Sequence, residues 1–149
     1  MASPVLNEGI LAIDPGTQHC GWAMLSSPFR VAEWGVLPPD EFVSWFWRRI
    51  QRPPTEGVAI EGFTLRGGTP QQHVLTVVQV LGYVRYTCIE LDVPCRVINP
   101  SERSAASVRM RSIEVLGMPR GKNAKHARDA VAAGQAALAR AATDKKTAL

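Results

Sequence analysis

Four side chains in the sequence are of types that could together hold divalent cations. Asp14 ends the apolar run ILAID, and Glu61 ends a second one, GVAIE. His126 and Asp129 lie three positions apart in KHARDA, which places both on one face of a helix. Oxygen-rich ligand sets suit Mg²⁺ or Mn²⁺. Two such ions about 3.5–4 Å apart can activate water and stabilise the leaving oxygen of a phosphodiester.

The position of Asp14 is the most informative of the four. A carboxylate at the tip of a buried strand is costly unless it is paired or neutralised by a bound cation. Each residue also has a plainer interpretation: Asp14 could cap the following PGT turn, and Glu61 could face solvent. His126 could be a half-exposed helix residue, with Asp129 paired to Lys125 four positions earlier. Taken together, three acids and a histidine at these element ends favour a metal site.

Alternating apolar patterns and turn residues predict the elements that must position this set. Strands are expected at residues 10–14, 20–25, 29–37, 57–61 and 95–98, the first two as an antiparallel hairpin. Helices are expected from Asp40, as a cap, to Ile50, then at 71–91, 103–116 and 124–142. This order predicts an α/β fold with a mixed five-stranded sheet and helices on both faces.

Length and composition indicate one globular domain. The chain has 149 residues, of which 46% are hydrophobic, enough for a single core. We expect this domain to span residues 1–142 and residues 143–149, which include TDKKT, to form a disordered tail. The N-terminus does not resemble a signal peptide, and no apolar run is long enough to span a membrane. Three cysteines with no zinc-site spacing predict free thiols in a reducing cytoplasm.

Basic residues are concentrated in one half of the chain. The net charge is +4, and the segment 96–128 holds eight Lys and Arg residues against two acids, Glu102 and Glu114. This imbalance favours a polyanionic partner such as a nucleic acid, although a merely solvated cationic surface would show the same pattern.

The predicted helix at 71–91 carries more apolar side chains than one buried stripe requires. One side can pack on the sheet, and the surplus indicates either a subunit interface or a core contact on two sides. The apolar residues are Val74, Leu75, Val77, Val78, Val80, Leu81, Val84, Ile89 and Leu91.

The ordered set of motifs IDPGT, CGWA, AIEGF, VQVLGYV, VINPSE and KHARDA resembles the RuvC family of Holliday-junction resolvases. It is most similar to the compact forms carried by bacteriophages, and the likeness runs from about Leu11 to Leu138. The resemblance implies an RNase H-like fold, a homodimer in a bacterial host cytoplasm, and metal-dependent nicking of two strands of a four-way DNA junction. Asp14, Glu61, His126 and Asp129 match the family's metal-binding set, which implies two Mg²⁺ or Mn²⁺ ions per site.

The resemblance also indicates where branched DNA would bind. Many family members have a base-contacting aromatic three positions after the second-strand glutamate, whereas Phe63 lies two positions after Glu61. The segment 101–122 is shorter and less lysine-rich than in bacterial members. We therefore name as candidate DNA contacts Phe63, Arg66, Arg103, Arg109, Arg111, Arg120, Lys122 and Lys125.

Two other functions fit parts of the same pattern. The acid–Gly–Thr turn between hairpin strands also resembles the phosphate loop of actin- and hexokinase-type ATPases, which need a second lobe that 149 residues do not supply. A non-catalytic protein that binds branched DNA could use the same fold, although the four retained site residues argue against it.

Overall fold

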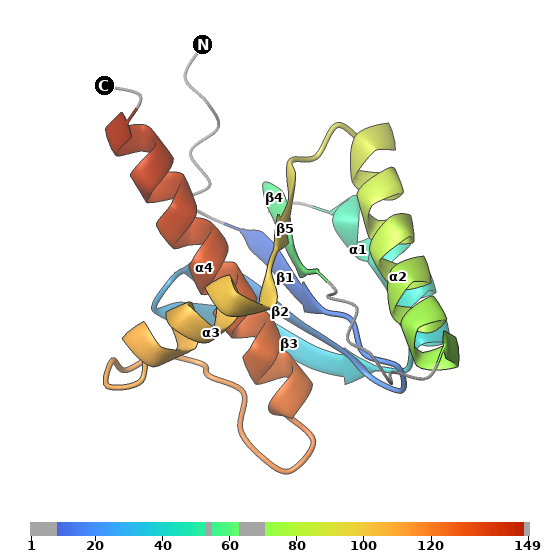
Figure 1. Ribbon diagram of the computed structural model, residues 1–149, viewed down its shortest axis with the longest axis horizontal. Helices are drawn as coiled ribbons and strands as arrows, with labels where there is room; N and C mark the ends of the chain where they lie inside the picture. The colour runs from blue at the N-terminus through green and yellow to red at the C-terminus, as the bar shows by residue number, and fades with distance from the viewer. Residues whose placement is uncertain (1–8, 53–54, 63–70, 148–149) are drawn as a thin grey trace.

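The computed structural model describes residues 9–52, 55–62 and 71–147. These residues form five strands and four helices in the order expected from the sequence (Figure 1). The strands are β1 (Ile10–Asp14), β2 (Cys20–Ser27), β3 (Arg30–Leu37), β4 (Gly57–Glu61) and β5 (Cys95–Ile98). The helices are α1 (Pro39–Ile50), α2 (Gln71–Glu90), α3 (Pro100–Arg109) and α4 (Lys125–Thr147). No helix in the described part of the chain is long and apolar enough to cross a membrane.

The strands form one mixed sheet with the spatial order β3-β2-β1-β4-β5. The β1–β2 and β2–β3 pairs are antiparallel, as the short PGTQH connection predicts, whereas β1–β4 and β4–β5 are parallel. The two parallel pairs need crossover connections, which the helices supply. The carboxyl ends of β1, β4 and β5 therefore lie at the same edge of the sheet.

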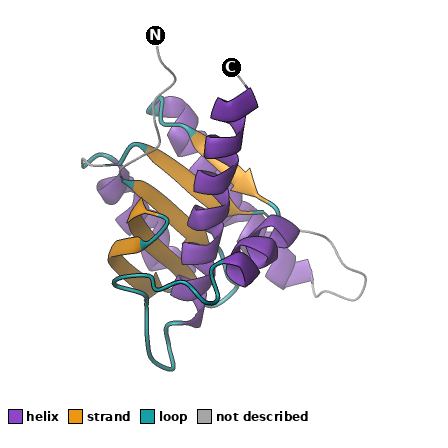
Figure 2. Ribbon diagram, turned by 90° about the vertical axis from the view of Figure 1, so that its left-hand side faces the viewer, coloured by secondary structure: helices purple, strands orange, loops and turns teal. Residues whose placement is uncertain are grey.

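The two faces of the sheet are covered by different helices, which confirms the predicted layers (Figure 1). On one face, Leu11 and Ile13 of β1 pack with the aromatic side of α1 and with Val84 of α2. On the other face, alternate strand residues such as Ala12 pack with α4. Figure 2 shows α4 lying across the strands. Its alanine-rich surface lets the helix approach the sheet closely.

Three predicted helix limits need correction. The helix expected from Asp40 begins at Pro39, with Pro38 at the N-cap position. Asp40 lies in the first turn, where its negative charge interacts favourably with the helix dipole. The helix expected through Ala142 continues to Thr147, so the disordered tail expected over 143–149 is corrected for 143–147. Residues 148–149 lie outside the described part of the chain.

The helix expected over 103–116 is the third correction, because α3 starts at Pro100 and ends at Arg109. Asn99 caps its start in a reciprocal capping box with Glu102. Beyond the helix, Leu116 accepts a backbone hydrogen bond of 2.8 Å from Val31, in the edge strand β3. Long-range backbone hydrogen bonds of this kind to β3 replace the helical bonds at residue 116, and helix propensity alone does not predict them.

Candidate metal centre

Asp14 and Glu61 lie side by side because their strands are parallel neighbours. Ile13 pairs with Ile60, and the two acids each follow one position later at the carboxyl end of the strand. Their carboxyl groups share a hydrogen bond. Asp14 is largely buried, with 9% of its surface exposed. The sheet register therefore brings together two acids separated by more than forty positions in the chain.

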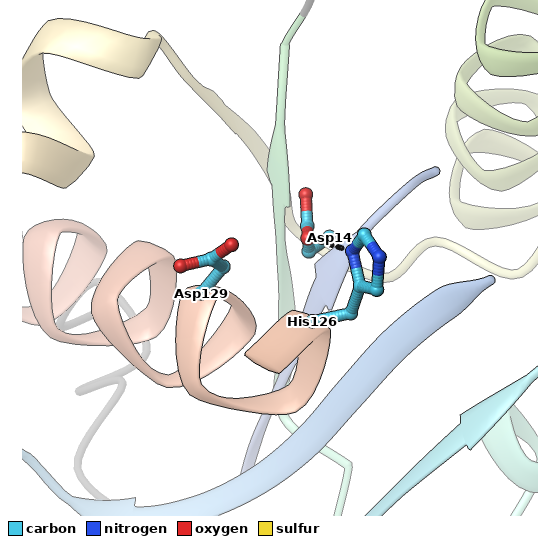
Figure 3. Close-up of side chains that lie close together, drawn as sticks. All are labelled: Asp14, His126 and Asp129. Atoms are coloured by element: carbon cyan, nitrogen blue, oxygen red, sulfur yellow. Dashed lines mark hydrogen bonds and ion pairs between the residues drawn. The ribbon is translucent and has the colours of Figure 1, made fainter. Parts of the chain in front are cut away.

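The first two turns of α4 bring His126 and Asp129 to the same edge. The Nδ1 atom of His126 lies 3.0 Å from Oδ2 of Asp14. One ligand atom from each of Asp14, His126 and Asp129 lies within 4.8 Å of the other two. Figure 3 shows the three side chains facing one another, with the His126–Asp14 contact dashed. The structure thus groups three of the four residues singled out from the sequence, and Glu61 lies at the end of the strand beside Asp14 but outside this ligand group.

Gly21 makes this approach of α4 to the sheet possible. A Cβ atom at this position in β2 would lie 2.1 Å from both the carbonyl carbon and the carbonyl oxygen of His126, and 2.5 Å from the backbone nitrogen of Ala127. Only a residue without a side chain lets the α4 backbone come so close. Gly21, opposite Asp14 in the β1–β2 ladder, therefore sets the distance between His126 and the strand tip.

Arg103 also enters the cluster, a placement that the sequence interpretation did not include. Its Nε donates to Oε1 of Glu61 at 2.8 Å, and its Nη1 donates to Oδ1 of Asp129 at 3.4 Å. The capping box at Asn99 was a usable signal. It starts α3 immediately after β5, so the first turn of the helix lies near the carboxyl edge of the sheet.

Burial disfavours the ionised forms of the two strand-end acids. Burial raises the pKa of Asp14 from 3.8 to about 6, and the nearby charge of Asp129 acts in the same direction. Burial, together with the hydrogen bond and charge of Asp14, raises the pKa of Glu61 from 4.5 to about 7. Arg103 acts against both shifts, and Lys125 acts against that of Asp14, without cancelling them. A bound cation would favour the ionised carboxylates.

The donor set fits a divalent cation. Two carboxyl groups and one imidazole form the ligand group on a partly buried edge, with the carboxyl group of Glu61 on the strand beside Asp14, and none of these ligands is a thiolate, which softer metals favour. Carboxylate oxygens are the ligands of Mg²⁺, and imidazole is also tolerated by Mn²⁺ and other transition ions. Among the described residues, the cluster is therefore a suitable site for such an ion.

The other predicted DNA contacts are exposed or lie outside the described residues. Phe63 and Arg66 belong to the segment 63–70, which is not described. Exposed side chains follow the chain from α3 to α4: Arg109, Arg111, Arg120, Lys122 and Lys125. His19, which the sequence interpretation did not select, stacks on His126 with the ring centroids 6.0 Å apart.

Comparison with known proteins places this geometry on a recognised fold. No protein-family model and no curated protein sequence matches the chain. Among solved structures, Thermus thermophilus RuvC in complex with a Holliday junction substrate superposes with a TM-score of 0.74 at 20% identity, covering 92% of this chain and 96% of that one.

Two resolvases from other sources are also similar. The yeast mitochondrial Holliday junction resolvase has a TM-score of 0.66 at 13% identity, covering 97% of this chain and 83% of that one. The fowlpox virus resolvase, solved with junction DNA, has a TM-score of 0.60 at 12% identity, covering 88% and 99%. The chain therefore has the RNase H-like fold of these proteins, as the sequence predicted. The likeness to bacteriophage forms stays a prediction.

Proposed function

We propose that this protein is a divalent-metal-dependent endodeoxyribonuclease that resolves Holliday junctions by paired nicking. The observation that carries the proposal is the grouping of Asp14, His126 and Asp129 at one sheet edge, with Glu61 at the end of the strand beside Asp14. The fold adds support, because structures with the same architecture include resolvases solved with junction DNA.

Each residue of the cluster has a proposed role. Asp14 contacts His126 and lies beside Glu61, so Asp14, Glu61, His126 and Asp129 would together hold the proposed two Mg²⁺ or Mn²⁺ ions. Bound at this place, the ions would activate water for in-line attack on the phosphorus and stabilise the departing 3′ oxygen. The products would carry a 5′-phosphate and a 3′-hydroxyl.

The chain's other residues orient the ligands and bind the substrate. The sheet below Asp14 and the close contact at Gly21 hold the acid and the imidazole in fixed positions. Arg128 donates to the carbonyl of Gly121 at 3.3 Å and so shapes the loop before α4. Arg120 and Lys122 project from this loop and would contact phosphates of the junction arms. Such contacts recognise the shape of the branch more than its sequence, and they weaken as salt rises.

A nicking assay on defined DNA shapes tests the proposal. With Mg²⁺ or Mn²⁺, we expect symmetric nicks near the crossover of a mobile four-way junction, little cutting of a linear duplex of the same sequence, and no cutting in EDTA. Tight binding to the junction without cleavage in either metal would instead support the alternative of a non-catalytic protein that binds branched DNA. ATP hydrolysis without DNA cleavage would favour the ATPase-like alternative. Replication forks and flaps in the same assay would rank the branched substrates.

We further propose that the active form is a homodimer that assembles through α2. Four apolar side chains on α2 are exposed in the single chain: Leu75, Val78, Tyr86 and Ile89, the last at 73%. A contiguous exposed apolar stripe is typical of a subunit contact. Two copies related by a twofold axis would present two cutting sites to the two opposing strands of a junction.

Replacing Ile89 with Glu should convert the dimer to a monomer, because it places a charge at the most exposed apolar side chain of the proposed contact. Sedimentation or light scattering would report the mass of each variant. Val108→Glu is the matched control, since Val108 is 61% exposed on α3, away from α2, and this variant should remain dimeric. A wild-type chain that is monomeric at high micromolar concentration would contradict the proposal.

A further inference from the structure

Arg103 makes two ion pairs in the cluster, and they involve two of the proposed metal ligands. Its side chain is only 25% exposed, and its guanidinium joins Glu61 on β4 to Asp129 on α4. The 2.8 Å contact through Nε is a short, charge-assisted hydrogen bond. Arg103 therefore supplies to these two carboxylates the positive charge that a cation would otherwise supply.

The carboxylate oxygens that accept hydrogen bonds from Arg103 are not free to coordinate a divalent cation at the same time. Oε1 of Glu61 accepts the Nε–H of Arg103, and Oδ1 of Asp129 accepts an Nη1–H. A guanidinium stays protonated throughout the physiological pH range, so Arg103 cannot leave by losing its charge. A cation that takes these oxygens must displace the side chain and overcome the repulsion between two positive groups.

We propose that Arg103 is a built-in competitor of the metal, which holds Glu61 and Asp129 in place without the ion and sets the concentration at which the ion binds. The inference rests on the proposed metal site and adds a positioning role for a residue outside the ligand set. The displaced guanidinium stays at the same edge of the sheet, where its planar donors suit a phosphate.

Metal binding to the full-length protein without DNA tests the competition. Mn²⁺ titration calorimetry would compare the wild type with Arg103→Gln. A charge within about 4–6 Å changes carboxyl ionisation by roughly 1 to 3 pK units, and the partial exposure of this pair places it at the low end of that range. We therefore expect Mn²⁺ to bind Arg103→Gln about tenfold more tightly. A merely structural role would predict weaker binding instead.

A matched control separates local competition from net charge. Arg48→Gln removes one positive charge from an exposed position on α1, at the opposite face of the sheet, and should leave the Mn²⁺ affinity unchanged. Equal Mn²⁺ affinity in the wild type and Arg103→Gln would overturn the inference while leaving the metal site intact. No Mn²⁺ binding by any variant would overturn the proposed function and the inference together.

Nuclear magnetic resonance gives a second test of displacement, in which the wild-type protein keeps the positive charge of Arg103. The Nε–H signal of Arg103 can be assigned as the arginine signal missing from Arg103→Lys. In EDTA we expect this proton to be protected from exchange by its bond to Glu61, and saturating Mg²⁺ should remove that protection. Unchanged protection in protein that has bound Mg²⁺ would contradict displacement, even if Arg103→Gln did not fold.

Discussion

The Asp14→Asn variant is expected to lose junction cleavage by about a thousandfold or more while it still binds junction DNA. Asp14 contacts His126 directly and shares a hydrogen bond with Glu61, so it is the residue common to both parts of the proposed ligand set. Asparagine has nearly the same shape but only one oxygen and no charge. Single-turnover nicking rates and junction affinity by fluorescence anisotropy, measured on the same preparation, would give both quantities.

Thermal unfolding in EDTA distinguishes lost chemistry from lost folding. Because burial raises the pKa of Asp14 to about 6, its ionised form destabilises the metal-free native state above that pH. Asp14→Asn removes this charge, so its melting temperature at pH 8 should equal or exceed that of the wild type. Asp40→Asn, at an exposed position of α1, is the matched control and should cleave normally. Normal cleavage by Asp14→Asn would end the proposed mechanism.

Replacing Gly21 with Ala is expected to destabilise the protein by about 3 kcal/mol or more, a large share of a domain's typical stability. The new methyl group would lie 2.1 Å from the backbone of His126, and backbone cannot rotate away as a side chain can. The N-terminal turn of α4 would have to lift from β2, and His126 would move away from Asp14. Urea denaturation of the purified variant would measure the change.

Gly62→Ala is the matched control for the Gly21 variant. Its added methyl group would lie 2.8 Å from Cγ1 of Val97, whose exposed side chain can turn aside, and 3.5 Å from the carbonyl oxygen of Ile98, which is an ordinary contact distance. We expect a cost of no more than about 1 kcal/mol. If both glycine variants are equally stable, the close approach of α4 to β2 does not hold the site together.

The sequence was sufficient to predict the elements because their signals are local. Alternation, apolar runs and turn residues indicated all five strands and their order, including the β1–β2 hairpin. The errors occurred at helix ends, where tertiary contacts decide. The helix expected over 103–116 is shorter because residue 116 hydrogen-bonds to β3, and the helix expected through Ala142 continues to Thr147.

The sequence by itself determined which groups could do chemistry: two acids at strand ends and a His–Asp pair at helical spacing. These signals are visible in one dimension because strand tips and helix faces follow directly from residue spacing. Only the tertiary structure decided how the groups meet. The parallel register sets Asp14 beside Glu61, and Gly21 lets α4 approach closely.

The role of Arg103 also depended on the tertiary structure. Arg103 ion-pairs with Glu61 and Asp129, whereas local sequence gives every arginine of the segment the same charge. The physical reason is that burial, pairing and competition for an oxygen atom depend on distances between residues far apart in the chain.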